Sequence, residues 1–268
     1  MTRLNPIIPT EHGAWAVIFV PLVIGASVTE SFSPRVILLA GSMLGFFLSH
    51  VPLQTLLRRR LEGLRDAVVV RASMLWAGIY LGVGTIFLVP LLLSGYWMIV
   101  PLGAVGVAAF LLTVSLRSRI PGKFLVDQIA VLGLTVSAPA AYVVTSGSFD
   151  RTAVTLWILN ALFFGGTVVY VHLKIRASAA RNPRLAWSDK ARLGTLNVLY
   201  HVLALSLVIF LVAVHYTPRL AIVAFVPMTI HSIYGTVRLS DKVRYKRLGI
   251  ILVGQSILFA VVLTHAGF

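Results

Sequence analysis

Runs of about twenty apolar residues, separated by short polar segments, recur along the whole chain. An α-helix needs about twenty residues to cross the ~30 Å hydrocarbon core of a bilayer, so each run predicts a transmembrane helix. The pattern predicts nine spans, near residues 13–30, 35–57, 72–94, 96–115, 125–146, 152–173, 193–215, 219–238 and 247–266. The sequence therefore predicts one all-α integral membrane domain over residues 1–268, a polytopic helix bundle.

Composition narrows the class of protein. Hydrophobic residues make up 58% of the chain and charged residues only 12%. A soluble domain carries about a quarter of its residues as charged side chains, so a soluble or disordered protein is excluded. The absence of cysteine excludes disulfides, thiolate catalysis and Cys-ligated zinc or iron–sulfur sites.

The basic residues lie on one side of the predicted bundle. The chain has 23 Lys and Arg against 8 Asp and Glu, and all the basic residues except Arg35, Arg151 and Arg219 fall in the N-terminal segment or in alternate connections. Because cytoplasmic loops carry the excess of Lys and Arg, this pattern places the N-terminus in the cytoplasm and the C-terminus outside. Topology and contact with membrane lipids therefore explain the charge, and no nucleic-acid partner is inferred.

Polar side chains gather near the predicted cytoplasmic ends of the spans. Such residues usually face a bundle interior or a water-filled cavity, because exposing them to lipid is costly. They are His50, Gln54, Asp127, His172, Lys174, Asn197, His201, His231 and Tyr234. Together they predict a polar cavity open to the cytoplasm. The alternative is that each makes a single hydrogen bond to a neighbouring helix.

A distinctive string, Pro-Thr-Glu-His-Gly-Ala-Trp, occupies residues 9–15. Glu11 and His12 are adjacent at the start of the first span, where a carboxylate and an imidazole can act as acid and base. The same residues also suit a structural anchor, with negative character in the first helical turn and Trp15 at the membrane interface. The sequence leaves both interpretations open.

Two histidines at similar depth raise the question of haem. His201 and His231 lie on neighbouring spans, and a pair of facing imidazoles is enough to ligate haem iron. No pair of histidines has a short metal-ligand spacing on one helix, so we assign no metal site from the sequence. The cofactor is left open.

The residues 9–15, followed by Ala16, Pro21 and Gly25, resemble the opening of the YwiC-like family of bacterial membrane proteins. That resemblance implies a multi-pass protein of the bacterial cytoplasmic membrane.

The predicted architecture also resembles the UbiA-type intramembrane prenyltransferases. The shared features are nine spans, a cytoplasmic N-terminus and long cytoplasmic connections after the second and sixth spans, here residues 58–71 and 174–192. In that superfamily, an Asp-rich motif at each of these loops holds Mg²⁺, which binds an isoprenoid diphosphate. This chain departs from the pattern, with His50-Val51-Pro52-Leu53-Gln54 at the first position and only Asp189 at the second. Mg²⁺ is therefore less expected than in the superfamily.

Basic side chains stand where the acidic motifs would be, and they bind phosphate without a metal. The ligand-binding residues expected are His50, Gln54, Arg58, His172, Lys174, Arg176, Asn197 and Tyr234. The residues expected to transfer protons or orient the substrate are Glu11, His12, Asp127, His201 and His231.

The leading functional hypothesis is a divergent UbiA-like enzyme that binds an isoprenoid or lipid anion. One alternative is a transporter or permease, although the outer halves of the spans lack the polar path that transport needs. The other is a membrane scaffold or assembly factor, for which a tightly packed bundle without a cavity is expected.

Overall fold

The computed structural model describes residues 5–9, 12–29, 33–63, 66–117, 124–179, 186–240 and 243–268. Within these ranges the regular secondary structure is entirely α-helical. The helices are α1 (His12–Ser27), α2 (Arg35–Glu62), α3 (Ala67–Leu93), α4 (Ile99–Leu116), α5 (Phe124–Leu134), α6 (Ser137–Ser146), α7 (Arg151–Ala179), α8 (Trp187–Ala213), α9 (Leu220–Val237) and α10 (Tyr245–Thr264).

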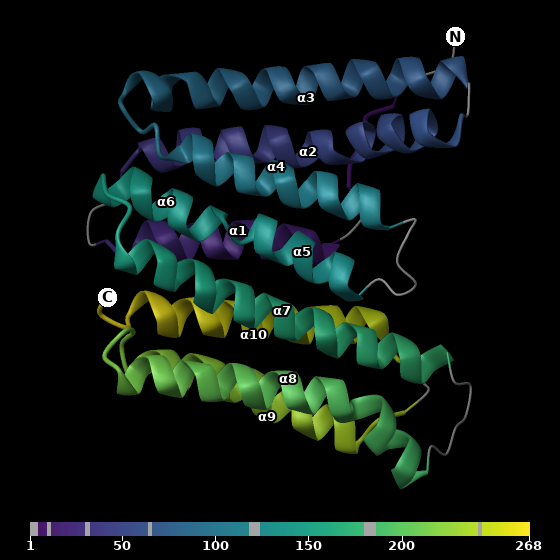
Figure 1. Ribbon diagram of the computed structural model, residues 1–268, viewed down its shortest axis with the longest axis vertical. Coiled ribbons are helices and arrows are strands. Elements are labelled where there is room, and N and C mark those ends of the chain that lie inside the picture. Colours follow the sequence, from purple (N-terminus) through teal and green to yellow (C-terminus); the bar gives the residue numbers. More distant parts are fainter. Residues whose placement is uncertain are drawn as a thin grey trace.

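These helices confirm the predicted membrane bundle. With α5 and α6 counted as one segment, eight described segments are long and apolar enough to cross a membrane. The shorter apolar helix α1, with 16 residues, supplies the ninth. The helices lie side by side, with α3 at one edge of the molecule and α8 and α9 at the other, and the two termini lie at opposite ends (Figure 1). A chain that crosses the membrane an odd number of times must have its two termini on opposite sides.

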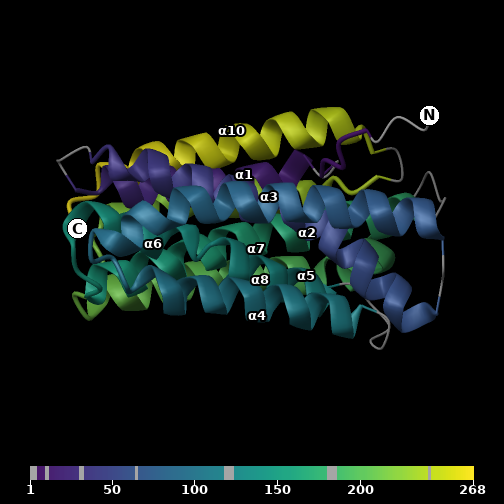
Figure 2. The same ribbon diagram turned by 90° about the horizontal axis from the view of Figure 1, so that it is seen from above.

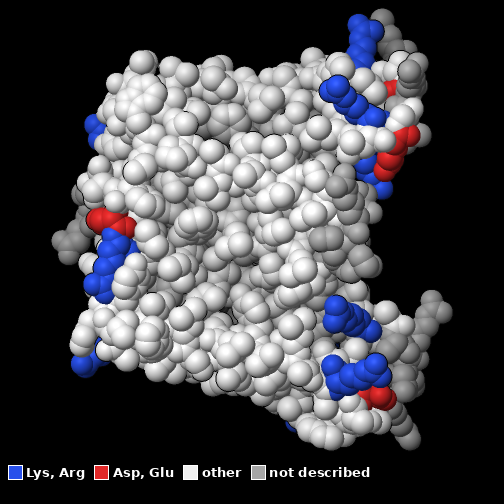
Figure 3. All heavy atoms as spheres, in the orientation of Figure 1, with Lys and Arg blue, Asp and Glu red and all other residues white. Residues whose placement is uncertain are grey.

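The second view shows that the bundle is several helices thick, with α10 on one face and α4 on the other (Figure 2). On the face seen in Figure 3, charged side chains lie at the two ends of the molecule, and a broad uncharged surface lies between them. We call the end where α2, α4, α7 and α9 finish the basic end, and the opposite end the outer end. By the positive-inside rule, the basic end faces the cytoplasm.

The helices run beyond their apolar stretches at the basic end, which corrects the expectation of long loops. α2 has 28 residues, about 42 Å of helix, and it ends at Gly63, whose φ of 69° suits glycine. The side chain of Asp66 then caps α3 by accepting from the N–H groups of Val68 and Val69, at 3.1 and 3.3 Å. Only four residues, 63–66, connect α2 to α3. Hydropathy does not detect a helix that continues into a basic segment, so it overestimates the loop.

The fifth predicted span is broken into α5 and α6. Pro139 has no N–H to offer the carbonyl of Thr135, so the helical ladder is interrupted one turn before the proline. The Thr135 carbonyl instead accepts from the N–H of Ala138 at 3.1 Å, in a tighter i to i+3 turn. A single continuous span over residues 125–146 is therefore replaced by two shorter helices in line.

The centre of the bundle is formed by α6 and α7. Every residue of α6 from Ser137 to Val144 is buried. α3, α4, α8 and α10 have much larger exposed apolar faces, which suits helices in contact with lipid. Gly25 of α1 lies so close to α6 that an added Cβ would lie 2.0 Å from the Ala138 carbonyl oxygen. Small residues thus allow the close helix contacts typical of membrane bundles.

Candidate functional site

The side chains expected to share one cavity are divided among several places in the described part of the chain. Lys174 and His231 line a pocket at the basic end, which we call the basic pocket. Asn197 and His201 lie in a buried polar network between α8 and α9. Asp127 and His172 form a separate pair between α5 and α7. Of the remaining predicted residues that the structure describes, His50, Gln54 and Arg58 lie on α2, and Arg176 and Tyr234 are exposed.

The basic pocket has a volume of about 300 Å³ and lies between α7, α9 and α10. It is lined by Tyr170, Lys174, His231, Arg238, Ser240, Val243, Arg244, Arg247, Leu248 and Ile251. Four of these side chains are guanidinium or ammonium groups, and no carboxylate is present among the described lining residues. The pocket therefore has an unbalanced positive charge.

The inner wall of the basic pocket is held by contacts between α7 and α9. Lys174 donates from Nζ to the carbonyl of Gly235 at 2.8 Å, and this nitrogen lies 5.0 Å from the centre of the Tyr170 ring. The ring of His231 packs edge-on against Tyr170 at 5.3 Å. Its Nε2 is buried and has no hydrogen-bond partner among the described residues. A polar ligand atom in the pocket would satisfy this nitrogen.

The opposite wall of the basic pocket is formed by the start of α10. The helix begins at Tyr245, and Arg244 before it makes no side-chain cap hydrogen bond. The first N–H groups of a helix carry partial positive charge and bind anions readily. Arg238, at the end of α9, places its guanidinium 4.9 Å from the centre of the Tyr234 ring. Guanidinium and ammonium groups thus line one cavity, and α10 begins beside it.

The network between α8 and α9 is buried, and it leaves Asn197 Oδ1 and His201 Nε2 without a hydrogen-bond partner among the described residues. Asn197 Nδ2 donates to Ser232 Oγ at 2.7 Å and to Thr236 Oγ1 at 2.9 Å. His201 Nδ1 lies 2.8 Å from the carbonyl of Asn197 and 3.0 Å from Ser232 Oγ. A Cβ on Gly166 of α7 would lie 2.9 Å from His201 Nε2, so haem ligation at this nitrogen would require α7 and α8 to separate.

Asp127 and His172 form the described acid–base pair. Asp127 Oδ2 lies 2.8 Å from His172 Nε2, and both side chains are partly exposed. The edge of Phe124 packs against the imidazole at 6.1 Å. The neighbouring Gln128 donates to the carbonyl of Gly165 at 3.1 Å, which fixes α5 against α7. This pair does not line the basic pocket.

The other predicted residues have separate surroundings. His50 Nδ1 lies 2.6 Å from the Phe47 carbonyl, and the Phe47 ring contacts Trp15 at 5.0 Å. Arg58 donates to Glu62 at 2.8 Å. The other members of the expected site are half-buried or exposed: Gln54, Arg176 and Tyr234. Glu11 and the side chain of His12 lie outside the described residues.

Sequence reasoning misses Arg238, Arg244 and Arg247 as site residues. In the sequence, the segment 238–247 has the character of a basic cytoplasmic connection and nothing more. Its distance along the chain from Lys174 gives no signal that the two meet. A cluster of arginines flanking the start of a helix is the available signal, because such a helix terminus attracts anions.

Eight described segments long and apolar enough to cross a membrane, together with the shorter apolar helix α1, define a polytopic α-helical integral membrane protein. The chain belongs to the YwiC-like protein family, whose profile matches residues 8–142. It is also 23% identical over 232 residues to a protein of Haemophilus influenzae that bears the name "Uncharacterized protein", covering 85% of this chain and 86% of that one. No solved structure matches the chain. The family match spans α1 to α6 as far as residue 142, so the basic pocket lies on helices beyond it.

Proposed function

We propose that this protein binds a phosphate-bearing amphiphile, an isoprenoid or lipid anion, with the phosphate in the basic pocket. The observation that carries the proposal is the convergence of Lys174, Arg238, Arg244 and Arg247 on one cavity without a carboxylate among its described lining residues. Four like charges repel one another, and an anion in the pocket relieves that repulsion. Arginine suits this role because its planar fork matches the oxygens of a phosphate.

The size and position of the pocket favour a headgroup over a whole lipid. Its volume of about 300 Å³ is at the lower end of the range for small-molecule sites. Leu248 and Ile251 form an apolar part of the wall, on the side of α10 that leads into the membrane. A phosphate at the arginines therefore leaves its hydrocarbon chain directed along these residues.

The proposal keeps the ligand class of the UbiA-type enzymes and changes how the phosphate is held. Cationic side chains and the N-terminus of α10 replace the acidic residues and Mg²⁺ of that superfamily. Asp127 and His172 provide an acid–base pair in the same cytoplasmic half, but our proposal is for binding and assigns them no step. We place the protein in the bacterial cytoplasmic membrane with the basic end inside.

The test is a binding titration of the purified protein in an uncharged detergent. Inorganic pyrophosphate, farnesyl diphosphate and phosphatidic acid are titrated separately, which distinguishes a free phosphate, an isoprenoid and a phospholipid. R244Q and R247Q each remove one guanidinium from the pocket, and K246Q is the matched control on the same helix that does not line it. Each pocket variant should weaken binding by about tenfold or more, because a hydrogen bond to a charged group contributes roughly 1.5–3 kcal/mol.

K246Q should bind like the native protein, and raising the salt concentration should weaken binding only moderately. Equal losses in K246Q and R247Q would show that the anions respond to surface charge alone, which contradicts the proposal. The proposal would also be contradicted if the native protein bound none of the three probes.

A further inference from the structure

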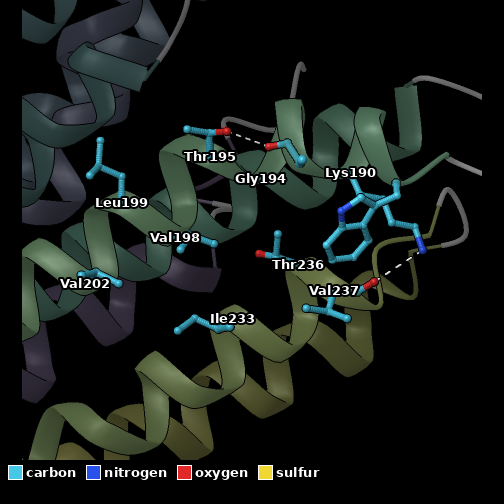
Figure 4. Close-up of a pocket in the computed structure, with 11 residues that line it drawn as sticks. Lys190, Gly194, Thr195, Val198, Leu199, Val202, Ile233, Thr236 and Val237 are labelled. Atoms are coloured by element: carbon cyan, nitrogen blue, oxygen red, sulfur yellow. Dashed lines mark hydrogen bonds between the residues drawn. The ribbon is translucent and has the colours of Figure 1, made fainter.

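A second hollow lies on the lipid-facing side of the bundle, between α8 and α9. It is an open groove of about 460 Å³ (Figure 4). Lys190, Val198 and Val202 follow α8 along one side, and Ile233 and Val237 belong to α9 on the other. Apart from Lys190 and two threonines, the side chains along the groove are apolar or glycine. The groove is separate from the basic pocket, because no described residue lines both.

Residue size explains why the groove exists. Gly194 brings α8 so close to α9 that a Cβ there would lie 2.1 Å from Thr236 Cγ2. On the lipid-facing side of this contact, α8 carries the short side chains of Ala191, Thr195 and Val198. Short side chains at spacings of three and four residues share one helix face and leave a continuous channel.

The groove has the length of one leaflet. From Trp187 to Val202 it follows sixteen residues of α8, a rise of about 22 Å along the helix. Half of a bilayer, with its headgroup region, is about 20–22 Å thick. Since Trp187 begins α8 at the basic end, the groove runs from the headgroup level to near the middle of the membrane. Trp187 is 68% exposed, as suits an aromatic ring at the interface.

Polar recognition is available only at the headgroup end. Thr195 donates to the Ala191 carbonyl at 2.7 Å, and Thr236 donates to the Ser232 carbonyl at 2.9 Å, so both hydroxyls are satisfied inside the protein. Among the described residues, Lys190 makes one long hydrogen bond, 3.4 Å to the carbonyl of Val237. Its ammonium group has three donors, so it can also bind a lipid phosphate.

We propose that this groove binds one acyl chain of an anionic phospholipid from the cytoplasmic leaflet, with the lipid phosphate at Lys190. The chain lies against Val198, Val202 and Ile233, and the positive charge at the groove's end selects the headgroup. This site does not depend on the basic pocket, which draws on different side chains of α7, α9 and α10.

The experiment is native mass spectrometry of the full protein, equilibrated with equal amounts of phosphatidylglycerol and phosphatidylcholine in an uncharged detergent. V198W fills the groove, and V107W places the same side chain on α4, where Val107 is 58% exposed on a different face. K190Q removes the charge without altering helix packing. R192Q is its matched control, on the same helix but outside the groove.

Native protein should retain one phosphatidylglycerol in preference to phosphatidylcholine. V198W should lose this lipid while V107W keeps it, and K190Q should lower the preference for phosphatidylglycerol about fivefold, as expected for one basic residue at a membrane surface. K246Q, at a residue that lines neither the groove nor the basic pocket, should leave the bound lipid unchanged. Equal retention in V198W and V107W, or equal binding of the two lipids by native protein, would overturn the proposal. A dimer that V198W abolishes would also overturn it, because the groove would then be a protein interface.

Discussion

Asp150 connects the last turn of α6 to the first turn of α7 at the outer end. Its carboxylate accepts from the hydroxyl of Tyr142 at 2.9 Å and from the N–H groups of Thr152 and Ala153 at 2.8 and 3.3 Å. Partial burial by itself raises the pKa of the Asp150 carboxyl, but these hydrogen bonds and one from Ser148 outweigh it. The pKa therefore lies below its ordinary value.

A lowered pKa makes the contribution of Asp150 to stability depend on pH. The ionised carboxylate is favoured in the folded state, so its contribution is complete above the ordinary pKa of about 3.9 and disappears as the pH falls through the lower folded value. D150A should lower the Tm at pH 7 by about 2–4 °C, as for a lost helix cap. D150N should retain part of the cap and lose the acid sensitivity. Thermal unfolding in detergent between pH 7 and pH 3 measures both effects, and an identical acid profile in native protein and D150N would contradict this account.

At the scale of helices, glycine positions decide which faces pack. Gly25 lies against the backbone of α6, whereas a Cβ added to Gly78 of α3 would have nothing within 4 Å. The two residues are equivalent in sequence terms, because each is a glycine inside an apolar helix. The contact between α1 and α6 therefore depends on Gly25, and Gly78 lies on an open face.

The substitutions G25A and G78A separate packing from helix propensity. G25A should destabilise the protein by about 1–3 kcal/mol, because its methyl group would force α1 away from the α6 backbone. G78A should be neutral or stabilising by up to about 1 kcal/mol, because alanine favours the helix and meets no neighbour. Unfolding by denaturant in mixed micelles compares them. A destabilisation of the same size in both variants would refute the proposed α1–α6 contact.

At the scale of the whole molecule, charge and crossing number determine orientation. From the basic residues at one end and an odd number of crossings, we predict that the α6–α7 connection lies outside the cell and the end of α2 inside. The break between α5 and α6 is the feature that most resembles a transporter, since many transporters have discontinuous helices near a central site. Here Thr135 at the break is fully buried by packing, and its hydroxyl donates to the Val131 carbonyl at 2.8 Å.

The absence of native cysteine permits a direct test of this topology. In intact bacterial cells, S148C in the α6–α7 connection should react with a membrane-impermeant thiol reagent. R60C near the end of α2 should react only after the membrane is permeabilised. Gel-shift detection of the labelled protein reports both, and native protein provides the unlabelled control. Labelling of R60C in intact cells would reverse the proposed orientation.

The sequence by itself determined the number of crossings, their boundaries to within several residues and the end that carries the positive charge. These properties depend on the partition of each side chain between lipid and water, which is local, so a run such as residues 35–57 specifies its own place in the membrane. The extension of α2 to Glu62 could not be predicted in this way, because a helix in water has no hydropathy signal.

Only the tertiary structure decided which polar residues share a site. His201 and His231 lie at similar depth on neighbouring helices, yet one is enclosed with Asn197 and the other lines the basic pocket. Lys174 meets the arginines of α10 only because α7, α9 and α10 pack together at the basic end. Such a meeting depends on the rotation of each helix about its axis. In a membrane that rotation is set by close packing at residues such as Gly166, because hydrophobicity is nearly the same on every face.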